Sequence, residues 1–316
     1  MVGERPAVQD VEGLTIGHAT NLNGRTGCTV IRFAHPALTA VEVRGAAPGT
    51  RELDLLASGR TVQRADALVL AGGSAVGLAA ADGVVRALAN DGRGFPTPAG
   101  PVPIVPAAVI YDLANGAPVA PGPLDGASAY RSAGSLHGTA QGRVGAGTGA
   151  TVSKMLGPSG QRPGGLGIAQ LSLGEHTITA IAVVNAFGVP VNDDGAAPDV
   201  REAFLASPSA QPPFGESTTL IAVVTNLPCD HGTLVRACVA AHDAMARAII
   251  PAHTLVDGDV VFASTLVEGL ISSGEALRFS VAVELGVERA IRSAIRTSPE
   301  HTTHLSAVIP ETREMR

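Results

Sequence analysis

The sequence predicts a folded α/β protein, and three observations carry this prediction. Hydrophobic residues make up 45% of the 316 residues and charged residues only 16%, a balance that excludes global disorder. Short β-prone apolar runs, of which 218–225 is the strongest, predict buried strands. Segments whose apolar residues recur at the helical period, such as 275–296, predict amphipathic helices. A chain of this length forms one or two domains.

Each element follows from its own stretch of sequence, taken in chain order. Apolar runs predict strands at 29–33, 40–43, 67–71, 102–112, 170–173, 177–185, 218–225 and 260–264. The first belongs to an extended segment that starts at residue 14 and turns at 21–24. Apolar residues at the helical period predict helices at 75–90, 234–249 and 275–296. Gly174-Glu175 turns a hairpin, Asp91-Gly92 ends the first helix and Pro251 follows the second.

Residues 191–216 differ in kind from the rest of the chain. Four prolines and scattered small residues leave little periodicity there, which predicts an exposed, mobile connector. A buried strand starts abruptly after it, at Thr218. The polar segment at the carboxyl end predicts an irregular tail. The junction between connector and strand is the most informative place in the chain.

The composition also narrows the partners and the compartment. No apolar run reaches the ~18 residues of a membrane helix, and residues 1–10 show no secretory signal, so we expect a cytoplasmic protein with no membrane partner. The net charge is -6 without a basic cluster, so nucleic acid is not an expected partner. Cys28, Cys229 and Cys238 include no CxxC pair, which predicts buried thiols rather than disulfides or a zinc site.

Familiar nucleotide-binding and nucleophile signatures are absent from the sequence. The glycine-rich stretch 145–149 has the spacing of neither a Walker loop nor a Rossmann fingerprint, so nucleotide binding is not expected. Ser74 stands in Gly-Gly-Ser-Ala-Val, which is not the GxSxG motif, and no cysteine has an activating context. A hydrolase built on this sequence must therefore activate its nucleophile by another device.

The use of basic residues singles out Lys154. Of the 22 basic residues, 21 are Arg and Lys154 is the one Lys. Arg and Lys differ in size, hydration and capacity for pKa change, so a solitary Lys points to a position that needs a compact ammonium. The alternative is an ordinary surface Lys.

The Ser217–Thr218 junction fits one further means of activation. A Thr whose own α-amino group acts as its base requires a cut just before that residue. The connector upstream would let the new end leave, and the strand downstream would hold Thr218 in place. An N-terminal amine has an ordinary pKa of about 8, so it accepts a proton at neutral pH. On the sequence alone, a purely structural Thr at the start of a strand remains the alternative.

A second candidate constellation lies at residues 253–259, where Asp257 and Asp259 flank a glycine. Alternate residues of an extended segment share one face, so the two carboxylates can point the same way. Such a pair raises one pKa and can orient a hydroxyl or an ammonium. The alternatives are a solvated turn and a metal site that includes His253.

Ordered motifs along nearly the whole chain connect these candidates. They are Asp10-Val-Glu-Gly-Leu-Thr-Ile-Gly-His-Ala19, Thr26-Gly-Cys-Thr-Val30, Ala47-Pro-Gly-Thr-Arg-Glu52, Leu70-Ala-Gly-Gly-Ser-Ala-Val-Gly77, Val105-Pro-Ala-Ala-Val-Ile-Tyr-Asp-Leu113, Gly145-Ala-Gly-Thr-Gly-Ala150 with Lys154, Val183-Val-Asn-Ala186, Ser217-Thr-Thr-Leu220 and 253–263. In these motifs the chain resembles the self-processing DmpA-like aminopeptidases, which include β-peptidyl aminopeptidases and endo-type nylon-oligomer hydrolases.

The resemblance implies a fold, a maturation step and a set of roles. The fold is the four-layer α-β-β-α sandwich of the DmpA and ornithine-acetyltransferase kind, a single domain over 1–316 that is cut into 1–217 and 218–316 and assembles into a homo-oligomer. The substrate is a small amide or peptide, and no cofactor or metal is implied. The implied site residues are Thr218 as nucleophile, Asp257 and Asp259 to position it, Lys154 to supply positive charge, Asn185 to donate to the oxyanion and Tyr111 to line the site.

The chain departs from the family pattern at two places. Ser217 stands where the family often has Asn or Gly, which leaves slower cleavage, or cleavage before Thr219, as alternatives. Asp257 and Asp259 stand where some peptidases carry a Ser and Glu pair, which brings the chain closer to the amide-hydrolase variants. Two other functions stay open on the sequence: an acyltransferase that uses a Thr made in the same way, and an unprocessed binding protein.

Overall fold

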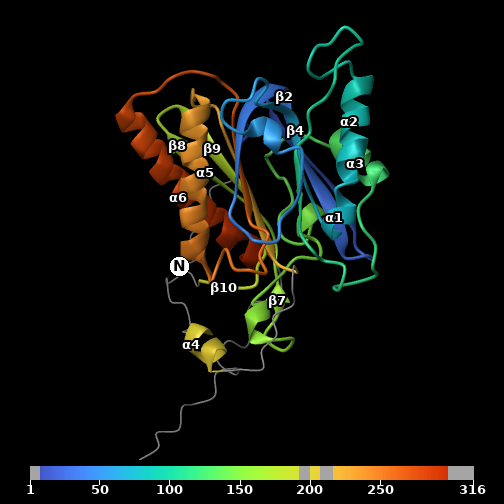
Figure 1. Ribbon diagram of the computed structural model, residues 1–316, viewed down its shortest axis with the longest axis vertical. Helices are drawn as coiled ribbons and strands as arrows, with labels where there is room; N and C mark the ends of the chain where they lie inside the picture. Colours follow the sequence, from blue (N-terminus) through green and yellow to red (C-terminus); the bar gives the residue numbers. More distant parts are fainter. Residues whose placement is uncertain (1–7, 192–199, 207–215, 298–316) are drawn as a thin grey trace, which may run out of the picture.

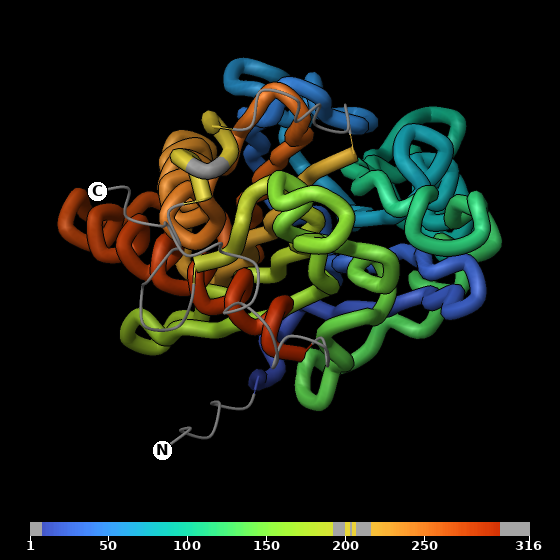
Figure 2. The backbone as a smooth tube through the Cα atoms, turned by 90° about the horizontal axis from the view of Figure 1, so that it is seen from below, coloured from blue at the N-terminus to red at the C-terminus, as the bar shows by residue number. Residues whose placement is uncertain are grey.

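The computed structural model describes residues 8–191, 200–206 and 216–297. These form four layers, with two layers of strands packed between two layers of helices (Figure 1). Helices α5 (His231–Ala248) and α6 (Ser273–Arg296) cover one outer face, and α2 (Ala80–Asn90) and α3 (Pro123–Arg131) cover the other. A view turned by 90° shows the two helical pairs at opposite sides of the strands (Figure 2). The α-β-β-α arrangement implied by the resemblance is therefore confirmed.

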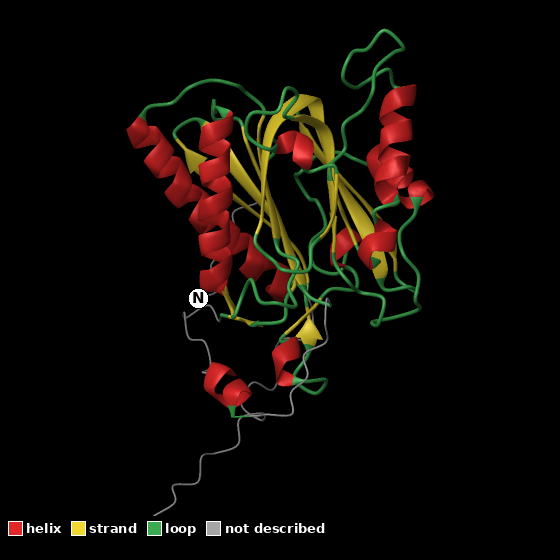
Figure 3. Ribbon diagram, viewed as in Figure 1, coloured by secondary structure: helices red, strands yellow, loops and turns green. Residues whose placement is uncertain are grey.

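Strands make up most of the interior (Figure 3). They are β1 (Leu14–Asn21), β2 (Thr26–Val43), β3 (Gly49–Arg51), β4 (Arg64–Ala71), β5 (Ala107–Val109), β6 (Thr151–Val152), β7 (Arg162–Pro163), β8 (Gly165–Leu173), β9 (His176–Asn185), β10 (Val189–Pro190), β11 (Thr218–Thr225), β12 (Ile249–Ile250) and β13 (Val260–Thr265). The remaining helices are short: α1 (Ser74–Gly77), α4 (Val200–Leu205) and the 3-10 turns η1 (Asp54–Leu56), η2 (Gly145–Gly147) and η3 (Lys154–Leu156).

The long strand β2 joins the two sheet layers. Its first part pairs with β1 and β4, and its last part, 38–43, pairs with β13. The register against β4 shifts between Arg32 and Ala37, and an irregularity of this kind lets a strand bend. The strand order β3-β5-β4-β2-β13-β11-β9-β8 is therefore one hydrogen-bonded sheet, bent at β2 into two layers.

Three hydrophobic clusters fill the three spaces between the layers. One lies under α5 and α6, one between the two sheet layers, and one under α2 and α3. Strand β11 shows the alternation directly: Ile221 and Val223 belong to the cluster under α5 and α6, while Leu220 and Val224 belong to the cluster between the sheets. Because β11 is buried on both faces, its sequence is an unbroken β-prone run.

Most of the predicted elements are confirmed, and four differ. Strand β11 has the predicted bounds, but the strands predicted at 29–33 and 40–43 are two parts of β2. The helix predicted at 75–90 is split into α1 and α2, and Gly77 of α1 packs so closely on Gly72 that an added Cβ would lie 1.8 Å from its carbonyl oxygen. Within the strand predicted at 102–112, only 107–109 forms a strand and Val102 makes an isolated bridge with Phe95, because two prolines there lack an N–H.

The predicted connector lies partly outside the described residues, at 192–199 and 207–215, and the predicted carboxyl-terminal tail lies outside them from residue 298. Between the two gaps the chain forms helix α4, which the sequence analysis did not predict. Phe204 of this helix packs edge-on against Phe187, with 5.8 Å between the ring centroids. Local composition therefore misled the prediction, because a tertiary contact holds this short helix in place.

Two compositional predictions can be compared with the structure. Cys28, Cys229 and Cys238 are buried and free, as predicted, and burial raises the pKa of the Cys28 and Cys229 thiols to about 12. In the described ranges no helix is both long and apolar enough to cross a bilayer.

The glycine-rich stretch 145–149 packs tightly: an added Cβ at Gly145 would lie 2.3 Å from the hydroxyl oxygen of Thr29. It is a close-packed turn, so its glycines are explained without a phosphate ligand.

Candidate active site

Thr218 is the first residue of β11 and lies at a meeting point of three strands. Its Cα is paired with Asn185, the last residue of β9, and two residues later Leu220 is paired with Val260, the first residue of β13. This is the lower end of the strands in Figure 1, near the labels β7 and β10. Thr218 is 4% exposed, so the candidate nucleophile lies in a nearly dry environment.

The carbonyl group of Ser217 lies against the hydroxyl of Thr218. Thr218 Oγ1 donates to the Ser217 carbonyl oxygen at 2.5 Å, and the backbone N–H of Gly258 donates to the same oxygen at 2.9 Å. An added Cβ at Gly258 would lie 2.8 Å from Thr218 Oγ1, so this glycine gives the loop its close approach. The bond that the sequence analysis expects to be cut is therefore flanked by its candidate nucleophile and by one N–H donor.

Lys154 is buried beside this junction, which excludes the surface Lys considered as an alternative. It is 8% exposed and begins the short turn η3, directly after Ser153, whose φ is 62°. Its Nζ donates to the side-chain oxygen of Asn185 at 3.0 Å and to the carbonyl oxygen of Glu216 at 2.5 Å. Burial lowers the pKa of Lys154 to about 7, although the charges of Asp257, Glu216 and Asp112 raise it.

Asn185 joins Lys154 to the segment before the junction. Its side-chain oxygen accepts from the backbone N–H of Thr151 at 2.9 Å as well as from Lys154. Because these two donors occupy the oxygen, the Nδ2 group faces the other way and donates to the carbonyl oxygens of Tyr111 and Glu216, both at 3.1 Å. The Glu216 carbonyl is therefore held by two donors, Lys154 and Asn185.

Asp259 reaches β11 through the backbone next to Thr218. One of its carboxylate oxygens accepts from the N–H of Thr219 at 2.7 Å. The other accepts from the backbone N–H of His253 at 3.0 Å and lies 2.8 Å from Nδ1 of the same residue. Asp259 is 1% exposed, so the solvated turn considered for this segment is excluded.

Asp257 has different partners from Asp259. It accepts from the N–H and the hydroxyl of Thr254, at 3.0 and 2.5 Å, and from the N–H of Phe187 at 3.3 Å. Burial and the neighbouring charge of Asp259 raise the pKa of Asp257. The two carboxylates are thus both buried at the junction, but only Asp259 holds the nucleophile strand directly.

Tyr111 enters the site by its backbone. It follows β5, and its carbonyl oxygen accepts the Nδ2 hydrogen bond of Asn185. The side chain is half-buried. The structure therefore brings all seven predicted residues, Thr218, Ser217, Asp257, Asp259, Lys154, Asn185 and Tyr111, to one end of the sheet.

Three groups at this site were not found by sequence reasoning. The first is the Gly258 N–H, and the second is the contact between His253 and Asp259, which the sequence analysis had considered only for a metal. The third is Asp112, a fully buried carboxyl that accepts the N–H of Gly73 at 2.7 Å. Burial raises its pKa to about 6. Its position directly after Tyr111 was the available signal, but burial cannot be read from that spacing.

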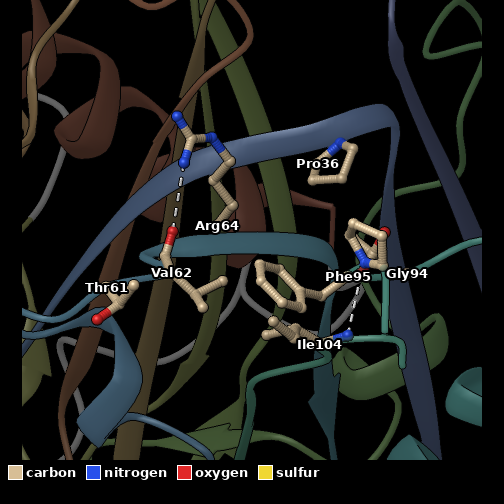
Figure 4. A pocket seen from close by; sticks show the side chains of 9 residues that line it. Pro36, Thr61, Val62, Arg64, Gly94, Phe95 and Ile104 are labelled. Carbon is tan, nitrogen blue, oxygen red and sulfur yellow. Dashed lines mark hydrogen bonds between the residues drawn. The ribbon is translucent and has the colours of Figure 1, made fainter. Parts of the chain in front are cut away.

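A surface pocket of about 180 Å³ lies elsewhere, around the bend of β2 (Figure 4). Its wall includes Pro36, Val62, Phe95 and Ile104 but none of the predicted site residues. Leu38, two residues from Pro36, pairs with Thr265 at the far end of β13 from Val260. The pocket is therefore at the opposite end of β13 from Thr218, and it is not part of the candidate active site.

Comparison with known proteins places the chain in a family. The model of peptidase family S58 matches residues 6–308. The chain belongs to peptidase family S58. It is therefore a hydrolase of the aminopeptidase and amidase kind, as the resemblance predicted.

Relatives of this S58 peptidase carry two kinds of name. An uncharacterized aminopeptidase from Mycobacterium leprae is 37% identical over 273 residues, which cover 77% of this chain and 74% of the relative. A 6-aminohexanoate-oligomer endohydrolase from Agromyces sp. is 34% identical over 238 residues, or 69% of this chain and 63% of the relative. The family thus includes both exo-acting and endo-acting names among similar sequences.

Solved structures confirm the fold of this S58 peptidase. The L-aminopeptidase D-Ala-esterase/amidase of Ochrobactrum anthropi, described as a variant of the Ntn hydrolase fold, has a TM-score of 0.72 and 18% identity, covering 93% of this chain and 89% of that chain. A Burkholderia sp. β-aminopeptidase has a TM-score of 0.71 and 19% identity, covering 94% and 90%. At these identities the likeness concerns the fold.

Proposed function

We propose that this S58 peptidase is a self-processing amidohydrolase whose nucleophile is Thr218, made by cleavage of the Ser217–Thr218 bond. One observation carries the proposal: the Thr218 hydroxyl and the Gly258 N–H both meet the carbonyl oxygen of that bond, at 2.5 and 2.9 Å. A hydroxyl next to a carbonyl that is already polarised by an N–H is the arrangement an intramolecular acyl shift requires.

The proposed maturation is an N-to-O acyl shift at Thr218 followed by hydrolysis of the resulting ester. Thr218 Oγ1 attacks the Ser217 carbonyl carbon and loses its proton, and the charge that develops on the carbonyl oxygen is stabilised by the Gly258 N–H. The C–N bond to Thr218 then breaks, the nitrogen takes up a proton, and an ester joins Ser217 to Thr218 Oγ1. Water hydrolyses this ester and leaves a carboxylate at Ser217 and a free α-amine on Thr218. The products are 1–217 and 218–316.

Turnover uses the same nucleophile on a second carbonyl. The free amine of Thr218 accepts the proton of its own hydroxyl, Oγ1 attacks the substrate amide, and the amine leaving group takes that proton. Water then releases the acid from the acyl-enzyme. No cofactor takes part in these steps. We propose amides of N-terminal amino acids, short peptides or related oligoamides as substrates, in agreement with the names of the two kinds of relative.

Lys154 and Asn185 have a role that changes with maturation in this proposal. In the uncut chain both donate to the Glu216 carbonyl. Departure of that segment would free Lys154 Nζ and Asn185 Nδ2 to meet a substrate oxygen, which is the oxyanion role expected for Asn185. A donor aimed at such developing charge lowers the barrier by about 3 kcal/mol. Asp259 fixes the Thr219 backbone, and Asp257 balances the charge of Lys154.

The homo-oligomer expected from the resemblance also remains part of this proposal. Leu277, Val281 and Leu285 are spaced four residues apart on α6 and are exposed at 68%, 57% and 39%, which gives that helix an uncovered apolar stripe. A second copy of the chain would cover it. Light scattering at micromolar concentration should give a multiple of the 31.7 kDa chain mass, and a Leu277→Glu variant should lower it.

The intact mass of the purified protein under denaturing conditions tests the function. The 31.7 kDa chain should give pieces of roughly 22 and 10 kDa, with Thr218 at the new amino terminus. A single mass near 31.7 kDa together with no amide hydrolysis would point to the unprocessed binding protein instead. An added amine that captures the acyl group faster than water does would point to the acyltransferase.

A further inference from the structure

His253 lies on the far side of Asp259 from the nucleophile strand. The imidazole Nδ1 is 2.8 Å from one oxygen of the Asp259 carboxylate, which also accepts the His253 N–H at 3.0 Å. The other oxygen accepts the N–H of Thr219 at 2.7 Å. A single carboxylate therefore links His253 to the residue that follows Thr218.

Both nitrogens of the His253 ring face acceptors. Nδ1 faces the Asp259 carboxylate, and Nε2 lies 3.4 Å from the carbonyl oxygen of His242. A neutral imidazole donates from one nitrogen only, whereas an imidazolium donates from both. Burial lowers the pKa of His253, but the hydrogen bond and the charge of Asp259 outweigh burial, so the pKa lies above its usual value.

The other groups around His253 leave Asp259 as its counter-ion. His242, from α5, packs edge-on against it at 4.8 Å between ring centroids, and burial lowers the pKa of His242 to about 4, so this ring is neutral. Arg44, just after β2, opposes the positive charge of His253. Its own charge is offset by Glu42 at 2.7 Å and Asp243 at 3.8 Å. The other nearby carboxylate, Asp257, faces Thr254.

The backbone at His253 also serves this contact. Its φ is 56°, in the left-handed region that a non-glycine residue rarely adopts. In this conformation the backbone N–H and the ring Nδ1 meet the same carboxylate oxygen. Backbone strain of this kind persists where the surrounding contacts require it, and it occurs often at functional sites.

We propose that His253 is a positioning residue for the reaction: as an imidazolium it donates to the Asp259 carboxylate and fixes it on the Thr219 N–H, and so holds Thr218 against the carbonyl it attacks. The inference rests on the proposed role of Thr218. It divides the carboxylate pair into two roles. Asp259 is the carboxylate that His253 holds against β11. Asp257 is the carboxylate whose charge balances that of Lys154.

Two variants test this role. His253→Asn keeps a residue that tolerates the left-handed conformation and can donate one hydrogen bond, but it removes the charge. His242→Phe is the matched control, because it keeps a buried ring against His253 and leaves the Asp259 contacts intact. Both are compared with the wild type by the rate of appearance of the two fragments, by kcat and KM for an amino-acid anilide, and by the pH dependence of kcat.

We expect His253→Asn to lower kcat and the processing rate by about 10- to 100-fold with little change in KM, the usual effect of losing a group that orients a catalytic side chain. The acid limb of the kcat profile reports deprotonation of the Thr218 amine, and it should move upward by about one pH unit, because the loss of a nearby positive charge raises the pKa of an amine. His242→Phe should lower the melting temperature and leave the acid limb in place.

Equal kcat and an unmoved acid limb in His253→Asn would overturn the inference, since a merely structural residue would change stability alone. If that variant does not fold, the wild type decides by histidine ¹⁵N NMR: His253, assigned by its contact to the His242 ring, should lose its second ring proton only above the usual histidine pKa, and loss of that proton below the usual pKa overturns the inference. Failure of the proposed function is distinct, because the wild type would then stay uncut.

Discussion

Strand β11 begins and ends with a buried Thr, and the two residues differ in what surrounds them. Thr225, at the far end, donates to the Thr177 carbonyl at 2.9 Å and accepts the Leu227 N–H at 3.0 Å, so its hydroxyl closes a loop. Thr218 donates to the carbonyl of its own chain neighbour. Their exposed fractions are similar, at 0% for Thr225 and 4% for Thr218. Residue type and burial therefore do not distinguish a structural Thr from a candidate nucleophile.

The difference lies in the buried charged groups around the Thr218 end. Lys154, Asp257 and Asp259 are all nine-tenths or more buried and surround the Thr218 end. Near Thr225 the hydrogen-bonding groups are backbone groups and the hydroxyl of Thr265. That hydroxyl donates to the carbonyl oxygens of Leu227 and Val267. Buried charges are costly unless they are paired, so their concentration at one end of a strand makes that end the candidate functional one.

The largest expected effect separates the two ends directly. Thr218→Ala should leave a single uncut chain near 31.7 kDa and lower amide turnover by at least about 10⁴-fold, because the attacking hydroxyl is gone. Thr225→Ala is the matched control and should be cut like the wild type. Intact mass measures both. Normal processing in Thr218→Ala would remove Thr218 from the mechanism and leave Thr219 as the candidate.

A smaller loss is expected when the close approach of the loop is blocked. Gly258→Ala places a Cβ 2.8 Å from Thr218 Oγ1 and 2.5 Å from the Ala47 carbonyl oxygen, so the N–H must move away from the Ser217 carbonyl. Processing should slow by about 100-fold, the usual effect of losing one oxyanion donor. Gly274→Ala meets no atom within 4 Å and is the control. Equal cleavage time courses for the two variants would contradict the donor role.

Lys154 tests the charge at the Thr218 end. Lys154→Arg puts a larger, planar cation into a buried position, and we expect turnover to fall by about 10- to 100-fold because the two Asn185 oxygens that accept from Nζ fit a compact ammonium. Lys154→Met, which keeps the apolar stem alone, should be at least as slow. Unchanged kcat in Lys154→Arg would reduce Lys154 to a general source of charge.

Lys154 should also make stability depend on pH. Its folded pKa is about 7, below the unfolded value of 10.5, so between these values the unfolded chain binds more protons and stability rises with pH. Urea unfolding of Thr218→Ala, which stays a single chain, should show a larger rise from pH 7 to 10 than the same chain that also carries Lys154→Met. Parallel slopes would mean that Lys154 keeps an ordinary pKa in the folded state.

The smallest effect is expected at the structural end. Thr225→Ala removes one hydrogen bond to each of two backbone groups and should destabilise the protein by about 1–2 kcal/mol. The urea midpoint, measured in the Thr218→Ala background, gives this value. Turnover measured in the otherwise wild-type chain should stay within two-fold. A large loss of turnover would show that the two ends of β11 are coupled, which the comparison does not predict.

Local sequence was sufficient for elements whose pattern agrees with their surroundings. Strand β11 and helix α6 were predicted closely because an unbroken β-prone run and a helical period each have one compatible environment. Helix α4 was missed because it depends on a contact with Phe187, outside the segment, and the split of 75–90 was missed because it depends on the close packing of Gly77 on the Gly72 carbonyl. The helix propensity of a segment does not depend on such contacts, so it cannot predict them.

By itself the sequence determined the α/β class, the junction at Thr218, the unusual Lys154 and, through its motifs, the family. The tertiary structure decided which partner each group has: Lys154 holds Glu216, Asp259 holds Thr219, and Asp257 holds Thr254. Alternation along an extended segment can bring two carboxylates to one face, but it cannot say what lies opposite them. That depends on strands 40 residues or more apart being packed side by side, and burial there sets both the hydrogen bonds and the pKa values.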